Sequence, residues 1–153
     1  MALFLVQHGR SLPKEKDPDQ GLTEEGMAEV KRIAGVAAGY KVRVSRIKHS
    51  GKKRAKQTAE ALASALAPEG GVEESRGLSP MDDVSAVARE LRTEDNLMFV
   101  GHLPFMEKLT SYLITGSPDS LIFKFQNGGI VCLDKTAESP LWFIKWALMP
   151  NIG

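Results

Sequence analysis

The chain has 153 residues, of which 42% are hydrophobic and 25% charged, a size and composition typical of one globular domain. Its 20 Lys and Arg residues nearly balance its 19 Asp and Glu residues, so the net charge does not indicate a nucleic-acid partner. With Cys132 as the only cysteine, an intrachain disulfide is excluded. We therefore expect a single domain that covers residues 1–153.

The first half of the chain predicts two strands, each followed by a helix. Residues 2–7 are apolar up to a final polar residue, which indicates a buried strand, and a polar loop follows. Thr23 is a suitable N-cap for a helix that stops at Gly39, because the apolar side chains between them recur at helical spacing. Residues 42–50, rich in Val and Ile, predict the second strand, and residues 52–66 predict the second helix.

The second half of the chain predicts one further strand and helix and then strands alone. Residues 72–75 can form a short strand. A helix after it carries Val84, Val87, Ala88 and Leu91 on one face. Residues 97–100 predict a third buried strand, and a helix follows it. The remaining apolar stretches predict strands at residues 120–125, 129–133 and 141–148.

The alternation of strands and helices is typical of an α/β fold with a mostly parallel sheet, because each helix carries the chain back to the start of the next strand. The strands near the end of the chain follow one another without a helix, which favours antiparallel pairing at an edge. We therefore expect a three-layer α/β/α fold, with a mostly parallel central sheet and antiparallel edge strands.

All three histidines of the chain lie where a predicted strand ends. They are His8, His49 and His102. In open α/β sheets, ligands bind beyond the carboxyl ends of the strands, so we expect the three imidazoles on the binding side. A single histidine in such a place is more often a hydrogen-bonded loop residue than a catalyst. Three of them at strand ends favour a functional site more strongly than each does alone.

Residues 41–57 carry eight basic side chains and no acidic one. This run can be a solvated basic face or a rim that attracts anions. Within it, Arg54 lies near the start of the second helix, where free backbone N–H groups and the helix dipole attract anions. Its guanidinium can bind a phosphate through two hydrogen bonds. Without further context, a solvated Arg54 is the simpler interpretation.

Four strings, in order, resemble the motifs of the histidine phosphatase superfamily, also called phosphoglycerate-mutase-like. They are Leu-Val-Gln-His-Gly-Arg-Ser at residues 5–11, Gly-Leu-Thr-Glu-Glu-Gly at 21–26, Ser-Gly-Lys-Lys-Arg-Ala-Lys-Gln-Thr-Ala at 50–59 and Val-Gly-His-Leu-Pro at 100–104. The resemblance covers nearly the whole chain and is strongest to the small SixA-type phosphohistidine phosphatases. It implies the phosphoglycerate-mutase-like fold and the hydrolysis of a phosphoryl group.

The resemblance also implies roles for individual residues. His8 falls on the family's nucleophile, which accepts the phosphoryl group as a covalent phosphohistidine, and His102 falls on the second catalytic histidine. Arg54 falls on the phosphate-binding arginine. We expect the phosphate site to be completed by Gln7, Arg10 and Ser50. Because phosphoryl transfer needs positioning and positive charge above all, this site requires no metal and no other cofactor.

At the first motif the chain departs from the family's usual Arg-His-Gly, because Gln7 stands where the arginine is expected. The Gln7 amide donates hydrogen bonds but carries no charge. Hydrogen bonds that involve a charge contribute about 1.5–3 kcal/mol, against about 1 kcal/mol for neutral ones, so we expect roughly tenfold weaker phosphate binding or turnover. Arg10, two residues beyond His8, is our candidate for restoring the charge.

The sequence does not identify the general acid. Asp82 and Asp83 lie in the region where the mutase branch of the family carries a catalytic Glu, yet the resemblance assigns neither, and a helix cap is the simpler interpretation. A phosphohistidine substrate needs less acid catalysis, because its P–N bond breaks readily once the nitrogen is protonated. Asn127 lies where many members place a polar residue near the pocket, whereas His49 falls on no catalytic position of the family.

We therefore expect a metal-independent phosphatase that hydrolyses phosphohistidine in a partner protein through a phosphohistidine on His8. The first alternative is a phosphatase of small phosphomonoesters. The second is a module that binds a phosphorylated ligand without turnover, which Gln7 favours. A metal hydrolase built on the three histidines is disfavoured, since no two of them lie four residues apart on a helix and no Cys or carboxylate cluster accompanies them.

The expected partners are a phosphorylated protein or a small phosphorylated substrate, and inorganic phosphate. Nucleic acid is not expected, because no Trp or Tyr interleaves with the basic run of residues 41–57. A membrane partner is not expected either, because no run approaches about 18 apolar residues and residues 2–6 are too few for the core of a signal peptide. Together with the single cysteine, this indicates a cytoplasmic protein.

Overall fold

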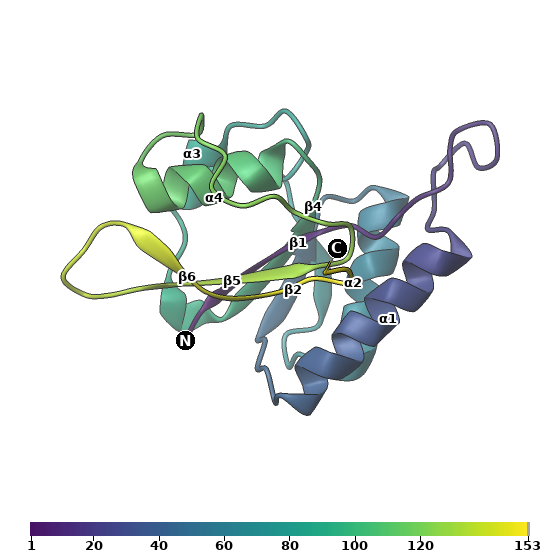
Figure 1. The fold of residues 1–153 in the computed structure, drawn as a ribbon, viewed down its shortest axis with the longest axis horizontal. Coiled ribbons are helices and arrows are strands. Elements are labelled where there is room, and N and C mark those ends of the chain that lie inside the picture. The colour runs from purple at the N-terminus through teal and green to yellow at the C-terminus, as the bar shows by residue number, and fades with distance from the viewer. Residues whose placement is uncertain (153) are drawn as a thin grey trace.

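The computed structural model describes residues 1–152 as one sheet with helices on both faces (Figure 1). The strands are β1 (Leu3–Gln7), β2 (Arg46–His49), β3 (Val72–Glu74), β4 (Leu97–Gly101), β5 (Ile130–Lys135) and β6 (Trp142–Leu148). The helices are α1 (Glu24–Gly39), α2 (Lys53–Leu66), α3 (Val84–Ala88) and α4 (Phe105–Thr115), with a 3₁₀ turn at Thr93–Asp95. None of the helices within residues 1–152 is both long and apolar enough to cross a membrane.

The sheet has six strands in the order β3-β2-β4-β1-β5-β6. The strands from β3 to β1 run parallel to their neighbours, whereas β5 is antiparallel to β1 and β6 is antiparallel to β5. This arrangement confirms the expected mostly parallel sheet with antiparallel strands at an edge. Because β1 and β4 are neighbours in the sheet, the residues that follow them are brought together from distant parts of the chain.

Alternate side chains of the central strands pack in two separate hydrophobic cores, because successive side chains of a strand point to opposite faces of the sheet. In β1, Phe4 and Val6 pack in the core beneath α1 and α2. Leu3 and Leu5 point to the other face and pack in the core beneath α3 and α4. Figure 1 shows these helix pairs on opposite sides of the sheet, which confirms the three-layer α/β/α arrangement.

Two helices begin at the residues that the sequence indicated. The Thr23 hydroxyl accepts a hydrogen bond from the backbone N–H of Gly26 at 2.8 Å, and α1 starts there. The Asp83 carboxylate accepts one from the N–H of Ser85 at 2.9 Å, and α3 starts there. Each side chain satisfies a backbone donor that has no partner inside its helix. Asp83 therefore has the capping role that was its simpler interpretation.

Residues 120–125 form no strand, so the prediction for this segment was wrong. Their backbone bonds to side chains of α4 rather than to another strand. The N–H of Ser120 donates to the Ser111 hydroxyl at 3.0 Å, and the N–H of Phe125 donates to the Glu107 carboxylate at 3.1 Å. Phe125 is buried in the core beneath α4. Of the apolar residues in this segment, Phe123 and Phe125 pack against the core, whereas Leu121 and Ile122 are exposed.

Two other elements are shorter than predicted. Residues 42–50 contain only a short strand, because the first of them close the turn after α1, where the N–H of Val42 donates to the carbonyl of Ala37 at 3.1 Å. The helix α3 ends before Leu91, whose N–H donates to the carbonyl of Ala88 at 3.3 Å. A bond over three residues tightens the chain and does not continue an α-helix.

Truncation of a core side chain tests the central strand. Leu5 of β1 is 0% exposed, so Leu5→Ala removes buried methyl groups, leaves a cavity and is expected to lower the free energy of unfolding by about 2–5 kcal/mol. The matched control is Leu121→Ala, because Leu121 is 67% exposed. The control should stay within about 0.5 kcal/mol of the wild type in urea unfolding. Equal effects of the two substitutions would contradict the burial of β1.

Candidate functional site

The three histidines lie at one edge of the sheet, because the parallel strands β1, β2 and β4 end there. His8 directly follows β1, His49 is the last residue of β2, and His102 directly follows β4. The register pairs Gln7 with Gly101, and the N–H of His8 donates to the carbonyl of Gly101 at 2.9 Å. The strand ends therefore hold the backbones of His8 and His102 side by side.

Two of the histidines, His8 and His102, face each other. Their ring centroids are 5.0 Å apart, and the ring planes are inclined by 53°. Ser50, in the turn between β2 and α2, contacts the second of these rings: its hydroxyl lies 2.6 Å from Nε2 of His102. His49 is buried and uses Nδ1 to accept the N–H of Gly51 at 3.0 Å. It supports the turn before α2, which is the loop-residue role that sequence reasoning left open for it.

A backbone contact fixes which nitrogen of His8 is free to react. Nδ1 lies 2.7 Å from the carbonyl oxygen of Gly9, which can only accept a hydrogen bond, so Nδ1 carries the proton and Nε2 holds a lone pair. Burial lowers the pKa of His8, the Gly9 hydrogen bond offsets part of this, and the Arg54 charge lowers the pKa again. The imidazole is therefore neutral at pH 7, as a nucleophile must be.

His102 is also held in its neutral form. It is 2% exposed, and its burial, together with the charges of His8, Arg54 and Lys52, lowers its pKa to about 3. Its Nδ1 is buried and has no hydrogen-bond partner within residues 1–152. A buried N–H without an acceptor is rarer than an acceptor without a donor, so the proton belongs on Nε2, which donates to Ser50. This N–H can donate to a phosphoryl oxygen instead.

Arg54 is the second residue of α2, at the helix end that attracts anions. The Thr58 hydroxyl joins the carbonyl of Arg54 to the N–H of Gly9, so the first turn of α2 lies beside the loop that carries His8. The Arg54 charge lowers the pKa of both His8 and His102. Burial lowers the pKa of Arg54 itself, yet it stays charged at any physiological pH. The N-cap residue, Lys52, makes no side-chain hydrogen bond to the first turn. The two imidazoles and the guanidinium thus converge on one place.

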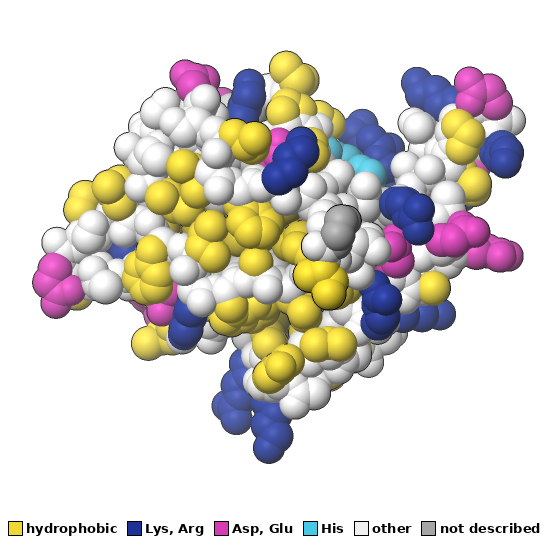
Figure 2. Space-filling view, in the orientation of Figure 1, with side chains coloured by type: hydrophobic (Ala, Val, Ile, Leu, Met, Phe, Trp, Pro, Cys, Tyr) yellow, Lys and Arg dark blue, Asp and Glu magenta, His cyan; other side chains and the backbone are white. Residues whose placement is uncertain are grey.

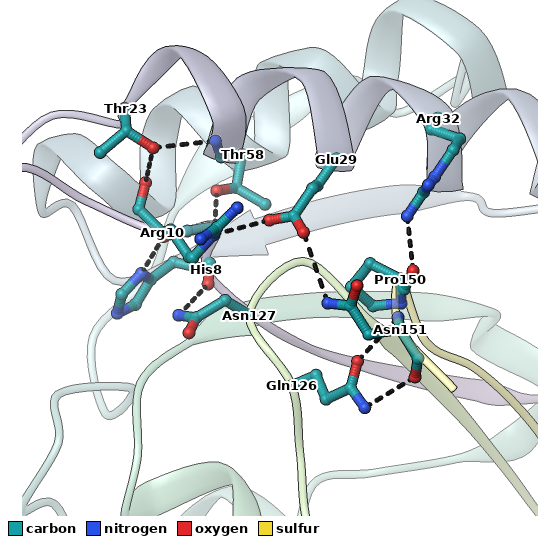
Figure 3. A network of polar contacts seen from close by, with 12 residues as sticks. His8, Arg10, Thr23, Glu29, Arg32, Thr58, Gln126, Asn127, Pro150 and Asn151 are labelled. Carbon is teal, nitrogen blue, oxygen red and sulfur yellow. Dashed lines mark hydrogen bonds and ion pairs between the residues drawn. The ribbon is translucent and has the colours of Figure 1, made fainter. Parts of the chain in front are cut away.

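Two side chains hold the reactive segments, and the motifs alone did not assign them this task. The Thr58 hydroxyl donates to the carbonyl of Arg54 at 2.8 Å and accepts the N–H of Gly9 at 2.9 Å, which ties α2 to the loop after β1. Asn127 donates from Nδ2 to the carbonyl of His8 at 2.9 Å (Figure 3). In the sequence, the only signal for Thr58 is its place four residues after Arg54, where a threonine hydroxyl reaches the preceding turn.

Arg10 turns toward α1. Its Nε donates to the Glu29 carboxylate at 2.9 Å, and Figure 3 shows the guanidinium lying against that carboxylate. Glu29 also accepts a hydrogen bond from the side chain of Asn151 at 3.4 Å. A phosphate that recruited Arg10 would have to compete with this ion pair. Its expected part in phosphate binding therefore stays a prediction.

Gln7 brings a buried amide next to His8. The residue is 8% exposed, and its Oε1 is buried without a hydrogen-bond partner in the described part of the chain. Its backbone carbonyl accepts the N–H of Gly128 at 2.8 Å, which fixes the end of β1. Leaving a buried acceptor unpaired costs about 1–3 kcal/mol. Such groups are rare and occur at functional sites.

A groove of about 740 Å³ opens beside Arg54, between the loop after β1 and the start of α2. Its basic lining residues, apart from Arg54, are Lys14, Lys52, Lys53 and Lys56. Figure 2 shows Lys and Arg side chains (dark blue) next to the histidine surface (cyan). Elsewhere in the run of residues 41–57, Arg46 and Lys48 pair with Glu73. One part of the run is thus a rim that can attract anions, and another part is a solvated face.

The aspartates considered as general acids both have local partners. Asp82 accepts the N–H of Ser79 at 2.9 Å, and Asp83 caps α3. Both line a second cleft, of about 520 Å³, that also borders Ser50. Neither position identifies a proton donor. Within residues 1–152, no three His, Cys, Asp or Glu side chains gather into a group that could hold a metal ion.

Comparisons with known proteins find sequences and structures similar to this chain. The model of the histidine phosphatase superfamily (branch 1) matches residues 3–83. Phosphohistidine phosphatase SixA of Escherichia coli (strain K12) is 30% identical over 98% of this chain and 94% of that protein. A solved structure of the protein histidine phosphatase SixA with tungstate is 27% identical, with a TM-score of 0.83 and 98% and 97% of the two chains covered.

A more distant structure extends the likeness of the fold. The alpha-ribazole phosphatase of Shigella flexneri is 14% identical, with a TM-score of 0.70 over 100% of this chain and 98% of that one. At this identity the likeness concerns the fold alone. Together with the SixA structure, it confirms the phosphoglycerate-mutase-like fold that the four sequence strings implied.

The depressed pKa of His102 makes stability depend on pH. The unfolded chain protonates this imidazole near its ordinary pKa of 6.5, whereas the folded chain resists protonation down to about 3. Below about pH 6 the unfolded state therefore binds an extra proton, and the free energy of unfolding falls as the pH falls. His102 alone should contribute a slope of about 1.4 kcal/mol per pH unit near pH 5, which urea unfolding between about pH 5.5 and 4.5 measures.

The His102→Gln variant has no titrating imidazole at this position. Its free energy of unfolding should therefore change with pH less steeply than that of the wild type, by about 1.4 kcal/mol per pH unit. Ser50→Ala is the control, because it removes the hydroxyl beside His102 but keeps the titrating ring. The control should retain the slope of the wild type. An unchanged slope in His102→Gln would show that His102 is not held neutral in the folded protein.

Proposed function

Because the chain belongs to branch 1 of the histidine phosphatase superfamily, we propose that it is a phosphatase that hydrolyses phosphohistidine in a partner protein through a covalent phosphohistidine on His8. The likeness to phosphohistidine phosphatase SixA over nearly the whole of both chains supports this substrate. So does the related structure with tungstate, a tetrahedral oxyanion like phosphate. The partner protein and the cytoplasmic location expected from the sequence stay predictions.

The observation that carries the proposal is the pair of facing, neutral imidazoles. His8 and His102 lie 5.0 Å apart between ring centroids, and both have lowered pKa values. The Gly9 carbonyl leaves the lone pair of His8 on Nε2. Arg54 adds a positive charge beside the pair. A nucleophile, a hydrogen-bond donor and a cation around one phosphate are the groups that phosphoryl transfer requires.

In the first step, Nε2 of His8 attacks the phosphorus atom of the substrate. The new P–N bond forms as the bond to the substrate imidazole breaks, and the departing nitrogen keeps the electron pair. When the other nitrogen of the substrate ring is already protonated, the ring leaves as neutral imidazole and needs no acid from the enzyme. Arg54 and the Nε2–H of His102 bind the equatorial oxygens, where negative charge concentrates in the transition state.

In the second step, water attacks the phosphorus on His8. The P–Nε2 bond breaks, its electron pair returns to Nε2, and inorganic phosphate leaves with a proton released to solvent. The Gly9 carbonyl matters here, because it keeps the proton on Nδ1. The phosphorylated ring is then cationic, and it departs as neutral imidazole rather than as an anion. The same contact thus exposes the nucleophile and makes it a good leaving group.

The alternatives differ in the leaving group and in turnover. A phosphomonoester has to lose an alkoxide, which calls for a general acid, and the two candidate carboxylates, Asp82 and Asp83, are engaged by backbone N–H groups. This favours a phosphohistidine substrate. Binding without turnover is the second candidate function, and the observation that favours it is the uncharged Gln7 beside His8.

The covalent intermediate can be trapped. Brief incubation with a phosphohistidine protein labelled in its phosphate, followed by denaturation at alkaline pH, should leave an acid-labile label on His8. His8→Ala should carry no label and lose more than about 10³-fold in kcat/KM, because it removes the nucleophile. His102→Gln keeps the nucleophile and should still take up label, at a lower rate. Label that persists in His8→Ala would contradict the proposal.

The missing charge at position 7 can be put back. Gln7→Arg adds a guanidinium next to His8 and is expected to raise kcat/KM, or tighten the binding of vanadate, by about tenfold. The urea midpoint of the variant reports whether the larger side chain is accommodated. If Gln7→Arg raises turnover and His8→Ala abolishes it, the chain is an enzyme whose activity Gln7 lowers, rather than a binding module. A folded Gln7→Arg variant without any gain would show that Gln7 does not limit the site.

A further inference from the structure

The groove beside Arg54 is more basic than phosphate binding alone requires. Five cationic side chains line it, against one carboxylate, that of Asp19. One of the cations is largely neutralised, because Lys53 donates to Asp17 at 2.8 Å, and this contact lowers the Asp17 pKa to about 2. Asp17 in turn accepts the N–H of Gly21 at 2.9 Å within the loop after β1, and its ion pair with Lys53 ties this loop to the start of α2.

The other lysines of the groove keep most of their charge available. Lys14 and Lys52 make no ion pair within residues 1–152. Lys56 has only a distant one, at 4.0 Å to Glu60, and both side chains are more than half exposed. Exposed ion pairs of this kind contribute little. Several like charges around a concave surface raise the local potential and concentrate anions there.

On the other side of Ser50, the charge has the opposite sign. The second cleft is lined by three carboxylates, those of Glu74, Asp82 and Asp83, and by one guanidinium, that of Arg76. Ser50 borders this cleft, while Gly51, the next residue, borders the basic groove. A bound phosphoprotein therefore meets positive potential on one side of the phosphate and negative potential on the other.

We propose that the groove lined by Lys14, Lys52 and Lys56 binds an acidic segment of the phosphorylated partner protein and so selects and orients it. The inference rests on the proposed function, since it names the partner of that same site. Gly51, which lines the groove, directly follows Ser50, whose hydroxyl lies 2.6 Å from Nε2 of His102, so a segment in the groove is continuous with a phosphohistidine at His8. Acidic residues on one flank of the phosphohistidine fit the groove, whereas acidic residues on the other flank meet the carboxylates.

The test uses three phosphohistidine peptides of one sequence. One has glutamates before the phosphohistidine, one has them after it, and one has glutamines at all these positions. One of the two acidic peptides should have a kcat/KM about tenfold above that of the neutral peptide at an ionic strength of about 0.01 M. The gain should vanish at about 1 M, where the Debye length is about 3 Å. Equal rates for all three peptides would overturn the proposal and leave the proposed function intact.

The groove itself is tested by the Lys14→Glu/Lys56→Glu double variant, which leaves the imidazoles and Arg54 in place. It should lose the preference for the acidic peptide, so that the ratio of the kcat/KM values of the acidic and neutral peptides falls to about one, whatever its rate on the neutral peptide. The matched control is Lys41→Glu, because Lys41 follows the far end of α1 and is equally exposed. The control should behave as the wild type. A double variant that retains the preference would place the acidic segment elsewhere.

A binding measurement separates this inference from catalysis. The acidic and neutral peptides are prepared with a stable triazole analogue of phosphohistidine, and fluorescence anisotropy gives their Kd values. If no peptide is hydrolysed, the proposed function fails, but tighter binding of the acidic analogue, lost in the double variant, still supports the groove. Equal Kd values would overturn the groove in that case. A single-stranded oligonucleotide that binds more tightly than the acidic analogue would also overturn it, since the groove would then fit nucleic acid better.

Discussion

The structure depends on the parallel pairing of β1 with β4. Pairing of Gln7 with Gly101 sets the register. The hydrogen bond from the N–H of His8 to the carbonyl of Gly101 extends this pairing one residue beyond β1. This contact places the two reactive imidazoles 5.0 Å apart, although His8 and His102 come from opposite ends of the family motifs. A slip of the register would separate them, and no side-chain adjustment could restore the pair.

Burial of polar groups at the site keeps the two imidazoles neutral but lowers the stability of the fold. Because His102 is buried and His8 is half-buried, and because Arg54 adds a positive charge, their pKa values fall and they stay neutral at pH 7. The same burial leaves Oε1 of Gln7 and Nδ1 of His102 without partners in the described structure. Proteins rarely tolerate such groups in a core, and here they adjoin the residues that would meet the phosphate.

The buried and the exposed groups of the site would have different roles. Neutral imidazoles and one guanidinium at the strand ends would perform the chemistry, where low polarity strengthens each interaction with the phosphoryl group. Exposed lysines in the adjoining groove act over a longer distance and are screened by salt, so they suit the choice of partner rather than the reaction. Thr58 joins the two regions, because its hydroxyl links the start of α2 to the loop after β1.

The sequence by itself determined the order of most strands and helices and the likeness to the family, because hydrophobic periodicity, the Thr23 cap and the four strings are local features. The reactive roles of His8, His102 and Arg54 stay predictions. It misjudged residues 120–125, whose apolar pattern resembles that of a strand but whose backbone bonds to side chains of α4. Only the tertiary structure decided that Arg10 pairs with Glu29 and that His49 supports a turn. The first outcome depends on the distance between side chains 19 residues apart, which packing fixes. The second depends on the backbone path of the turn and on the orientation of the buried ring, which no local pattern encodes.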